Sequence, residues 1–193
     1  MSNPDQAILL NQLTSGDDQI AEAAALALAD LGAPILPSLQ ALLHSPDPEA
    51  RWWANRTLAE LDSPQAISVL IESLKDSDIA VRQCAALALS RRPSHVAVKP
   101  LVALLDNPDY LLARLAANAL VACGASTVPD LLEVMQTGSQ AARLGAIRAL
   151  ALIGDTRAIP VLFTALDEDS ALIEYWADEG LQRMGVGMTF FKP

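Results

Sequence analysis

Apolar residues recur along this chain at helical spacing, in two segments for every 30 or 31 residues. In the second segment of each pair, an alanine stands eight residues before a helix-ending position and a leucine stands four residues before it. The helix-ending positions are Gly32, Asp62, Pro93, Gly124, Gly154 and Gly185; the alanines are Ala24, Ala54, Ala85, Ala116, Ala146 and Ala177; the leucines are Leu28, Leu58, Leu89, Leu120, Leu150 and Leu181. Matches in every unit indicate an internal repeat.

The first segment of each repeat carries an apolar pair four residues apart, which is the spacing of about one helical turn. The pairs are Leu9/Leu13, Leu39/Leu43, Leu70/Leu74, Leu101/Leu105, Leu131/Met135 and Leu162/Leu166. Short polar turns, such as 44–48, 75–78 and 106–109, separate the two segments and offer side-chain oxygens that can cap the second helix. Each repeat is therefore predicted to be a helix, a turn and a helix, and stacking buries a stripe that neither helix can bury alone.

The composition favours helices over strands, because Ala and Leu dominate the 52% of hydrophobic residues and aromatic residues reach only 4%. We predict an all-α fold, a right-handed α-solenoid of about six helical hairpins that forms one domain over residues 1–185. The predicted units are about 5–32, 33–62, 63–93, 94–124, 125–154 and 155–185. Residues 186–193 are predicted to be a C-terminal tail, in which Phe190 and Phe191 either cap the last repeat or form a docking peptide.

The chain is acidic, with a formal net charge of −10 and a pI near 4.5. This balance disfavours binding to nucleic acid or to an anionic membrane surface. No export signal and no uninterrupted apolar stretch long enough to cross a bilayer is visible in the sequence, so we expect a cytoplasmic protein. Cys84 and Cys123 lie in helical patterns without CxxC spacing, which favours buried thiols over a disulfide or a metal site.

Segments 158–167 (AIPVLFTALD) and 78–89 (DIAVRQCAALAL) resemble the HEAT-like repeats of the phycobilisome lyase family. The resemblance implies a supporting ladder between an Asp in the turn and an Arg early in the second helix. The ladder positions are occupied by Asp47/Arg51 and Asp78/Arg82 and, for the arginine alone, by Arg143; Ala21, Ala113 and Glu174 interrupt it. The family includes bilin lyase subunits, phycobilisome disassembly factors and binding scaffolds, so the resemblance specifies the fold more than the function.

The repeat register also predicts which side chains face away from the core. Steps of about 100° from the repeated alanine place the positions two before, two after and five after it on the opposite side of the helix. In α-solenoids the second helices usually line the concave face, which is the expected binding surface. The candidate partner-binding residues, which we call the outward stripe, are Trp52, Arg56, Gln83, Leu87, Arg91, Arg114, Asn118, Leu144, Arg148, Tyr175, Glu179 and Arg183.

Residues 51–56 (RWWANR) and 174–179 (EYWADE) occupy the same six repeat positions with opposite flanking charges. Trp53 is predicted to pack against a neighbouring repeat, whereas Trp52 faces outward beside Arg56. The two segments could hold one long partner. Alternatively, Arg51 and Arg56 could pair with acidic groups of a second copy in a weak head-to-tail self-association.

Catalytic signatures are scarce. His44 and His95 are far apart in sequence and lack the His-Glu pairs of the di-iron deoxyhypusine hydroxylases, which share HEAT-like repeats; phosphate loops and GxSxG motifs are also missing. We therefore predict no catalytic residues, no metal and no cofactor.

The favoured function is a noncatalytic scaffold that binds an acidic, partly apolar protein on the outward stripe, because Trp, Tyr and Arg anchor many interfaces. The alternative to a binding stripe is a set of ordinary solvated helix faces. The second-ranked function, implied by the resemblance, is a bilin lyase-like protein or phycobiliprotein-handling chaperone. In that case Arg56, Arg114 and Arg148 would hold the bilin propionates, and Trp52, Leu87 and Leu144 would contact its rings.

Overall fold

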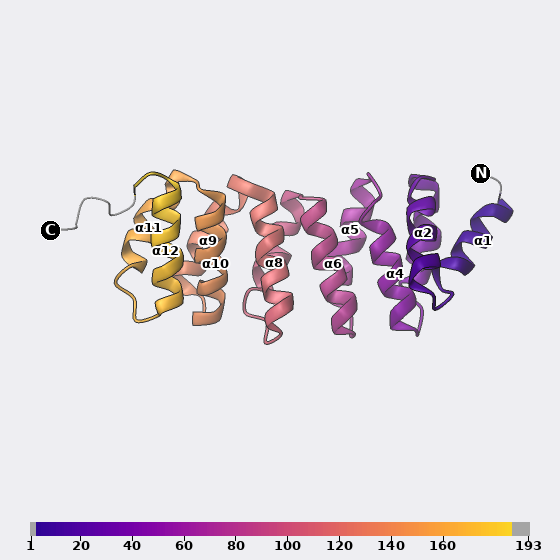
Figure 1. Ribbon diagram of the computed structural model, residues 1–193, viewed down its shortest axis with the longest axis horizontal. Helices are drawn as coiled ribbons and strands as arrows, with labels where there is room; N and C mark the ends of the chain where they lie inside the picture. Colours follow the sequence, from indigo (N-terminus) through magenta and orange to yellow (C-terminus); the bar gives the residue numbers. More distant parts are fainter. Residues whose placement is uncertain (1–2, 187–193) are drawn as a thin grey trace. The chain divides into compact units, whose positions relative to one another are not determined.

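The computed structural model describes residues 3–186, and all regular structure within that range is helical. This confirms the all-α fold class. The helices pair into hairpins in the predicted order, each formed by a first and a second helix (Figure 1). The pairs are α1 (Asn3–Leu13) with α2 (Asp18–Ala29), α3 (Leu36–Leu42) with α4 (Pro48–Leu58), α5 (Pro64–Ser73) with α6 (Ile79–Arg91), α7 (Val98–Ala103) with α8 (Tyr110–Cys123), α9 (Val128–Thr137) with α10 (Gln140–Ile153), and α11 (Ile159–Ala165) with α12 (Ala171–Arg183).

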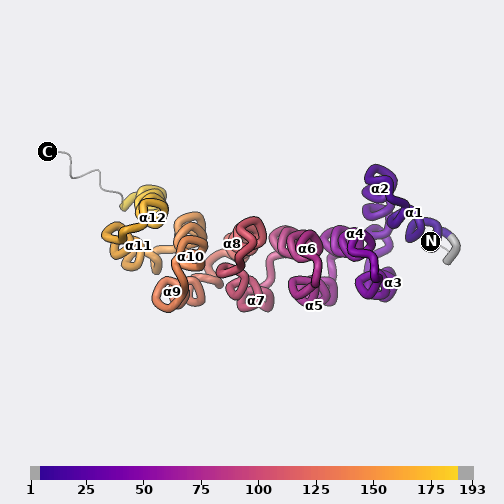
Figure 2. The backbone as a smooth tube through the Cα atoms, turned by 90° about the horizontal axis from the view of Figure 1, so that it is seen from below, coloured from indigo at the N-terminus to yellow at the C-terminus, as the bar shows by residue number. Residues whose placement is uncertain are grey.

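The chain divides into two compact units, Met1–Arg92 and Pro93–Pro193, each of which contains three hairpins. In the first unit α4 packs against both α2 and α6, and in the second unit α10 packs against both α8 and α12. Within each unit the first and second helices form separate layers, as Figure 2 shows for α5 and α6 and for α9 and α10. The predicted tail lies outside the described residues from position 187 onward.

The repeated alanines and leucines form the core of both units. All six alanines of the repeat column are at most 1% exposed, and all six leucines are fully buried. In the first helices, Leu9, Leu43 and Leu166 are half-buried, and the other members of the predicted pairs are buried. The side chains that define the repeat in the sequence therefore face the interior of the hairpin stack.

The polar turns cap five of the six second helices as predicted, whereas the side chain of Ser170 makes no capping bond to α12. Asp47 accepts a hydrogen bond from the Glu49 amide at 3.0 Å, and Asp78 accepts one from the Ala80 amide at 2.8 Å. Asp17, Asp109 and Ser139 cap α2, α8 and α10 in the same way. These carboxylates and hydroxyls satisfy amides that have no partner within the first helical turn.

The supporting ladder differs from its predicted form. The carboxylate partner of Arg51 is Asp76, with Nε to Oδ2 at 2.8 Å, whereas Asp47 and Asp78 serve as helix caps. Arg143 pairs in the same way with Glu168. Both pairs span 25 residues, so the arginine of one repeat contacts an acid in the turn of the next repeat. Arg82 donates to the backbone oxygens of its own turn, as Arg51 also does, but the residue 25 positions later is Asn107 in place of an acid.

Gly124 ends α8 with a φ of 66°, a conformation that other residues rarely adopt. The helical stretch Tyr110–Thr137 around it is long and apolar enough to span a membrane, which the sequence-based expectation overlooked. It consists of α8, a 3-10 turn (Gly124–Thr127) and α9, and α8 and α9 pack in different hairpins. Since 39% of its most apolar 18-residue window is buried, packing between repeats accounts for part of this apolar character.

Candidate functional site

The outward stripe is accessible along its whole length. Leu87, Arg91, Arg114, Tyr175 and Arg183 are exposed, and its remaining seven residues are half-buried. The register therefore placed all twelve side chains on a solvent-facing surface. Whether they bind a partner stays a prediction.

The part of the stripe in the first unit is electrostatically balanced. The guanidinium of Arg56 pairs with the carboxylates of Glu22 and Glu60, and Glu60 also pairs with Arg91 at 2.7 Å. A hollow of about 480 Å³ beside Trp52 is lined by Asp18, Glu22 and Glu49 as well as by both tryptophans. Arg56 is thus neutralised within its own chain, and the surroundings of Trp52 would repel an acidic partner.

The two adjacent tryptophans differ in exposure, in the predicted direction. Trp53 is only 5% exposed, whereas Trp52 is half-buried. Their rings meet edge to face, with centroids 4.8 Å apart. Arg51 is buried and bound to Asp76, so neither Arg51 nor Arg56 offers the free cation that the head-to-tail association requires.

The second unit contains a pocket of about 620 Å³ on the stripe side, which we call the Gly145 pocket. Three successive second helices, α8, α10 and α12, and the turn before α8 form its walls. Apolar side chains predominate, and two guanidiniums contribute to the lining. The lining residues are Leu105, Asp106, Asn107, Pro108, Tyr110, Ala113, Arg114, Ala117, Ala141, Leu144, Gly145, Arg148, Leu172 and Trp176.

Gly145 forms part of the pocket wall at a point where the backbone of α10 leaves little room for a side chain. The equivalent position, one before the repeated alanine, holds Trp53 in the second repeat and Leu115 in the fourth. A Cβ at Gly145 would lie 3.1 Å from Leu105 Cδ2, so the helix backbone of α10 closely approaches the preceding hairpin at this point. Ala113, Ala117 and Ala141 add further short side chains to the walls.

Two arginines and one acid, Asp106, contribute charged groups to the pocket lining. Among residues 3–186, neither Arg114 nor Arg148 forms a salt bridge. Arg148 donates to Asn118 Oδ1 at 2.9 Å, and its Cζ lies 5.5 Å from the centroid of the Trp176 ring. Arg114 Cζ lies 5.9 Å from the Tyr110 ring centroid. Aromatic faces thus support both guanidiniums while leaving them available to an anion.

The sequence prediction contained part of this pocket. It included Arg114, Leu144 and Arg148, and the structure brings these three together. It missed Tyr110, Gly145, Leu172 and Trp176. The available signal was the comparison of equivalent positions, since a glycine in the middle of a helix replaces a large residue in other repeats.

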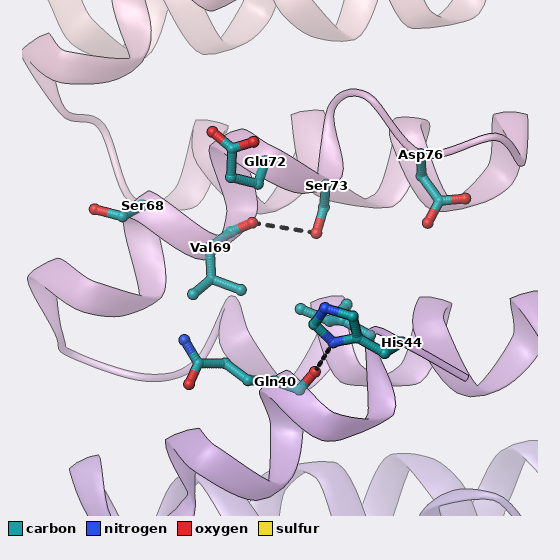
Figure 3. Close-up of a pocket in the computed structure, with 8 residues that line it drawn as sticks. Gln40, His44, Ser68, Val69, Glu72, Ser73 and Asp76 are labelled. Atoms are coloured by element: carbon teal, nitrogen blue, oxygen red, sulfur yellow. Dashed lines mark hydrogen bonds between the residues drawn. The ribbon is translucent and has the colours of Figure 1, made fainter. Parts of the chain in front are cut away.

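A second hollow, of about 700 Å³, lies between the first helices α3 and α5 (Figure 3). Its polar groups are largely occupied by contacts within the chain. His44 Nδ1 lies 2.8 Å from Gln40 O, Ser73 Oγ donates to Val69 O, and Asp76 binds Arg51. The Gly145 pocket, with its two arginines, is therefore the stronger candidate for a ligand site.

Reactive and metal-binding groups add no competing site. Burial raises the pKa of the Cys84 thiol to about 12, which keeps it protonated and unreactive at neutral pH. Burial also raises the pKa of the half-buried Cys123. Within residues 3–186, no group of three or more His, Cys, Asp or Glu side chains is arranged to hold a metal ion.

The sequence profile of HEAT repeats matches residues 7–78, 35–122 and 98–182. Curated relatives include phycocyanobilin lyase subunit alpha of Picosynechococcus sp., 29% identical over 155 residues, which cover 70% of this chain and 57% of the relative. The same subunit of Synechococcus elongatus is 35% identical over 100 residues, which cover 48% and 36%. The chain thus spans about half the length, or less, of these curated relatives. An uncharacterized phycocyanin operon protein Z of Pseudanabaena tenuis is 28% identical over 148 residues, covering 72% and 73%.

Solved structures agree with the fold. The complex of CpcE and CpcF of phycocyanin lyase from Nostoc sp. PCC7120 matches with a TM-score of 0.61 and 21% identity, covering 77% of this chain and 99% of the matched chain. A designed armadillo repeat protein matches with a TM-score of 0.51 and 18% identity, covering 92% and 98%. At these identities the matches establish the architecture of stacked helical hairpins.

Proposed function

Because this chain belongs to the HEAT repeat family, whose members bind through the surfaces of stacked hairpins, we propose that it is a binding protein that holds an open-chain tetrapyrrole in the Gly145 pocket. The observation that carries the proposal is the pair of guanidiniums, Arg114 and Arg148, at one apolar pocket. The proposed role is that of a lyase-like subunit or chaperone in bilin handling, and no chain residue is assigned a catalytic role.

The chemistry of the pocket suits this ligand. An open-chain tetrapyrrole combines flat apolar rings with two propionate groups. Arginine binds carboxylates through paired, charge-assisted hydrogen bonds, and each of the two guanidiniums can take one propionate. Leu144, Leu172 and Trp176 offer apolar surface to the rings. The volume of about 620 Å³ falls within the range of about 300–1,000 Å³ for small-molecule sites.

The relatives support the same ligand class. Two of them are named phycocyanobilin lyase alpha subunits, and a third is named after the phycocyanin operon. These names motivate the choice of a bilin among anionic, partly apolar ligands, whereas the two arginines motivate the choice of this pocket.

The test is titration of the full chain with phycocyanobilin, followed by bilin absorbance and tryptophan fluorescence. Trp176 lines the pocket, so we expect both a spectral shift and quenching. Loss of a charge-assisted hydrogen bond costs about 1.5–3 kcal/mol, so Arg114→Ala and Arg148→Ala should each weaken binding about 10- to 100-fold.

Arg183→Ala is the matched control, because Arg183 is a stripe cation on α12 that lies outside the pocket and contacts Glu179. Its affinity should equal that of the wild type. Equal weakening by all three substitutions would show that binding follows net charge alone. A wild type that leaves the bilin spectrum unchanged would refute the proposal.

A protein-binding scaffold is the second candidate, favoured by the continuous accessibility of the outward stripe in each unit. If the chain is a scaffold of this kind, its ligand is a bilin-carrying protein and not free bilin. Titration with a purified apo-phycobiliprotein distinguishes the two, since binding that survives Arg114→Ala and Arg148→Ala would place the contact elsewhere on the stripe.

A further inference from the structure

The hairpin α11–α12 exposes a mixed apolar and acidic surface on the side away from the Gly145 pocket. We call it the end surface and define it as Phe163, Leu166, Asp167, Ala171, Glu174, Tyr175 and Asp178, which line a hollow of about 660 Å³. Phe163 is 41% exposed and Tyr175 is 56% exposed. Large apolar side chains at such exposure often mark interaction surfaces when they gather in one hollow.

The repeat register shows that this surface corresponds to a stacking face. Glu174 stands three positions before the repeated Ala177, as Arg51 does before Ala54 and Arg143 before Ala146. Arg51 and Arg143 both bind an acid of the following hairpin. The helix side that carries Glu174 is therefore the side that interior hairpins turn toward the next one.

Burial at equivalent positions supports this assignment. The equivalents of Leu166 and Asp178 in the preceding hairpin, Met135 and Ile147, are 5% and 0% exposed. Leu166 and Asp178 are both only half-buried. Among residues 3–186, no element covers the end surface in the way that α12 covers α10.

The charges on the end surface are negative and available. Within the described residues, neither Asp167 nor Glu174 forms a salt bridge, and Asp178 accepts a hydrogen bond from the neutral Gln182. At the ladder position, Glu174 reverses the charge of Arg51 and Arg143. A complementary partner must therefore supply a cation where Asp76 and Glu168 supply an anion in the interior of the stack.

We propose that the end surface binds an amphipathic helical segment of another protein, whose apolar side chains cover Phe163, Leu166 and Tyr175 and whose Lys or Arg side chains pair with Glu174 and its acidic neighbours. Tyr175 is held for this contact by an edge-to-face packing on Trp176, with ring centroids 5.3 Å apart. A partly ordered aromatic side chain loses little conformational freedom on binding.

A second copy of this chain does not meet the requirement. The turn of its first hairpin carries Asp17 and Asp18, and Asp17 caps α2. Stacking that turn onto the end surface would bring like charges together. The charge pattern thus favours a different, basic partner over self-association.

The test uses a fluorescein-labelled 18-residue peptide with Leu at helical positions i, i+3, i+4 and i+7 and Lys on the flanks, and a second peptide with Glu in place of Lys. Fluorescence anisotropy with the full chain should show saturable binding of the Lys peptide and none of the Glu peptide. Glu174→Lys and Phe163→Ser should each weaken binding about tenfold or more.

Glu133→Lys provides a matched control, since Glu133 is an exposed acid on α9 of the same unit and the substitution changes the net charge equally. It should bind as the wild type does. If Glu133→Lys and Glu174→Lys weaken binding equally, binding depends on the net charge of the chain and not on the end surface, and the proposal is overturned. Circular dichroism of each variant establishes that it is folded.

Two further outcomes would also overturn it. Equal binding of the Glu peptide would remove the role of the acidic groups. Binding by a chain shortened to residue 186, but not by the full chain, would identify residues 187–193 as the occupant in place of a partner. The bilin titration stands apart from all these results, because neither Phe163 nor Glu174 lines the Gly145 pocket.

Discussion

Asn55 is the polar residue most at odds with its surroundings, and removing its amide should stabilise the protein. The side chain is fully buried in α4, and neither Oδ1 nor Nδ2 has a hydrogen-bond partner among the described residues. Three of the five equivalent positions in other repeats hold a buried alanine, namely Ala25, Ala86 and Ala117. Alanine is therefore compatible with this position in the hairpin stack.

The size of the effect follows from three contributions. A buried polar group without a partner costs about 1–3 kcal/mol. Alanine exceeds asparagine in helix propensity by about 0.5 kcal/mol. Against these gains, the removal of three side-chain heavy atoms loses about 1–2 kcal/mol of packing. We expect Asn55→Ala to raise the free energy of unfolding by about 1 kcal/mol, which for a chain of this size raises Tm by about 2–4 °C.

The measurement is thermal and urea denaturation followed by circular dichroism, beside the wild type. Thr57→Val is the matched control, because Thr57 is equally buried in the same helix but donates to Trp53 O at 2.9 Å. It should lower stability by about 0.5–1.5 kcal/mol. A fall in stability for Asn55→Ala as large as that for Thr57→Val would show that the Asn55 amide is satisfied in the folded state and would refute the reasoning.

Three other expectations rest on single contacts. Gly145→Leu should abolish bilin binding, because its Cβ would lie 3.1 Å from Leu105 Cδ2 and displace a side chain that lines the pocket; the bilin titration measures the loss, and thermal denaturation measures the cost of this crowding to the fold. Gly180→Ala should lower the free energy of unfolding by about 1–3 kcal/mol, because the new Cβ would lie 2.9 Å from Ala151 Cβ and 3.0 Å from Ala151 Cα. Urea denaturation measures the change, and an unchanged midpoint would contradict this close packing. The hydrogen bond from Arg51 holds the pKa of Asp76 below its usual range. The pair therefore stabilises the folded state above the unfolded pKa of about 4, and this stabilisation is lost as the pH falls through the lower folded pKa. Asp76→Asn should lower the free energy of unfolding by about 3 kcal/mol at pH 7, and its difference from the wild type should shrink as the pH is lowered.

The fold could be predicted from the sequence because one physical requirement acts at many positions. Close packing of hairpins demands small residues at one column and leucine at another, as at Ala54 and Leu58, and these columns repeat six times. The caps followed from equally local chemistry, since Asp47 and Asp78 each act within three residues of their own position.

The pairing of charges could not be predicted from local chemistry alone. The ladder prediction placed Asp47 beside Arg51, whereas the structure pairs Arg51 with Asp76, 25 residues away. The choice depends on which side of the helix faces the next hairpin, and that side is determined by packing between repeats. The pocket at Gly145 was missed for the same reason, because residues of three helices and one turn form it together.

The difference between the two parts of the stripe nevertheless has a simple origin in the register. Arg56 finds its two acids 34 residues earlier, at Glu22, and four residues later, at Glu60. Arg148 has the same repeat position as Arg56, but the residues at those two offsets are Arg114 and Leu152. The same geometry that closes an ion-pair cluster in the first unit therefore places two arginines at one pocket in the second. Because neither position holds an acid, Arg148 forms no ion pair like that of Arg56, and this is why we place the proposed anionic ligand at the Gly145 pocket.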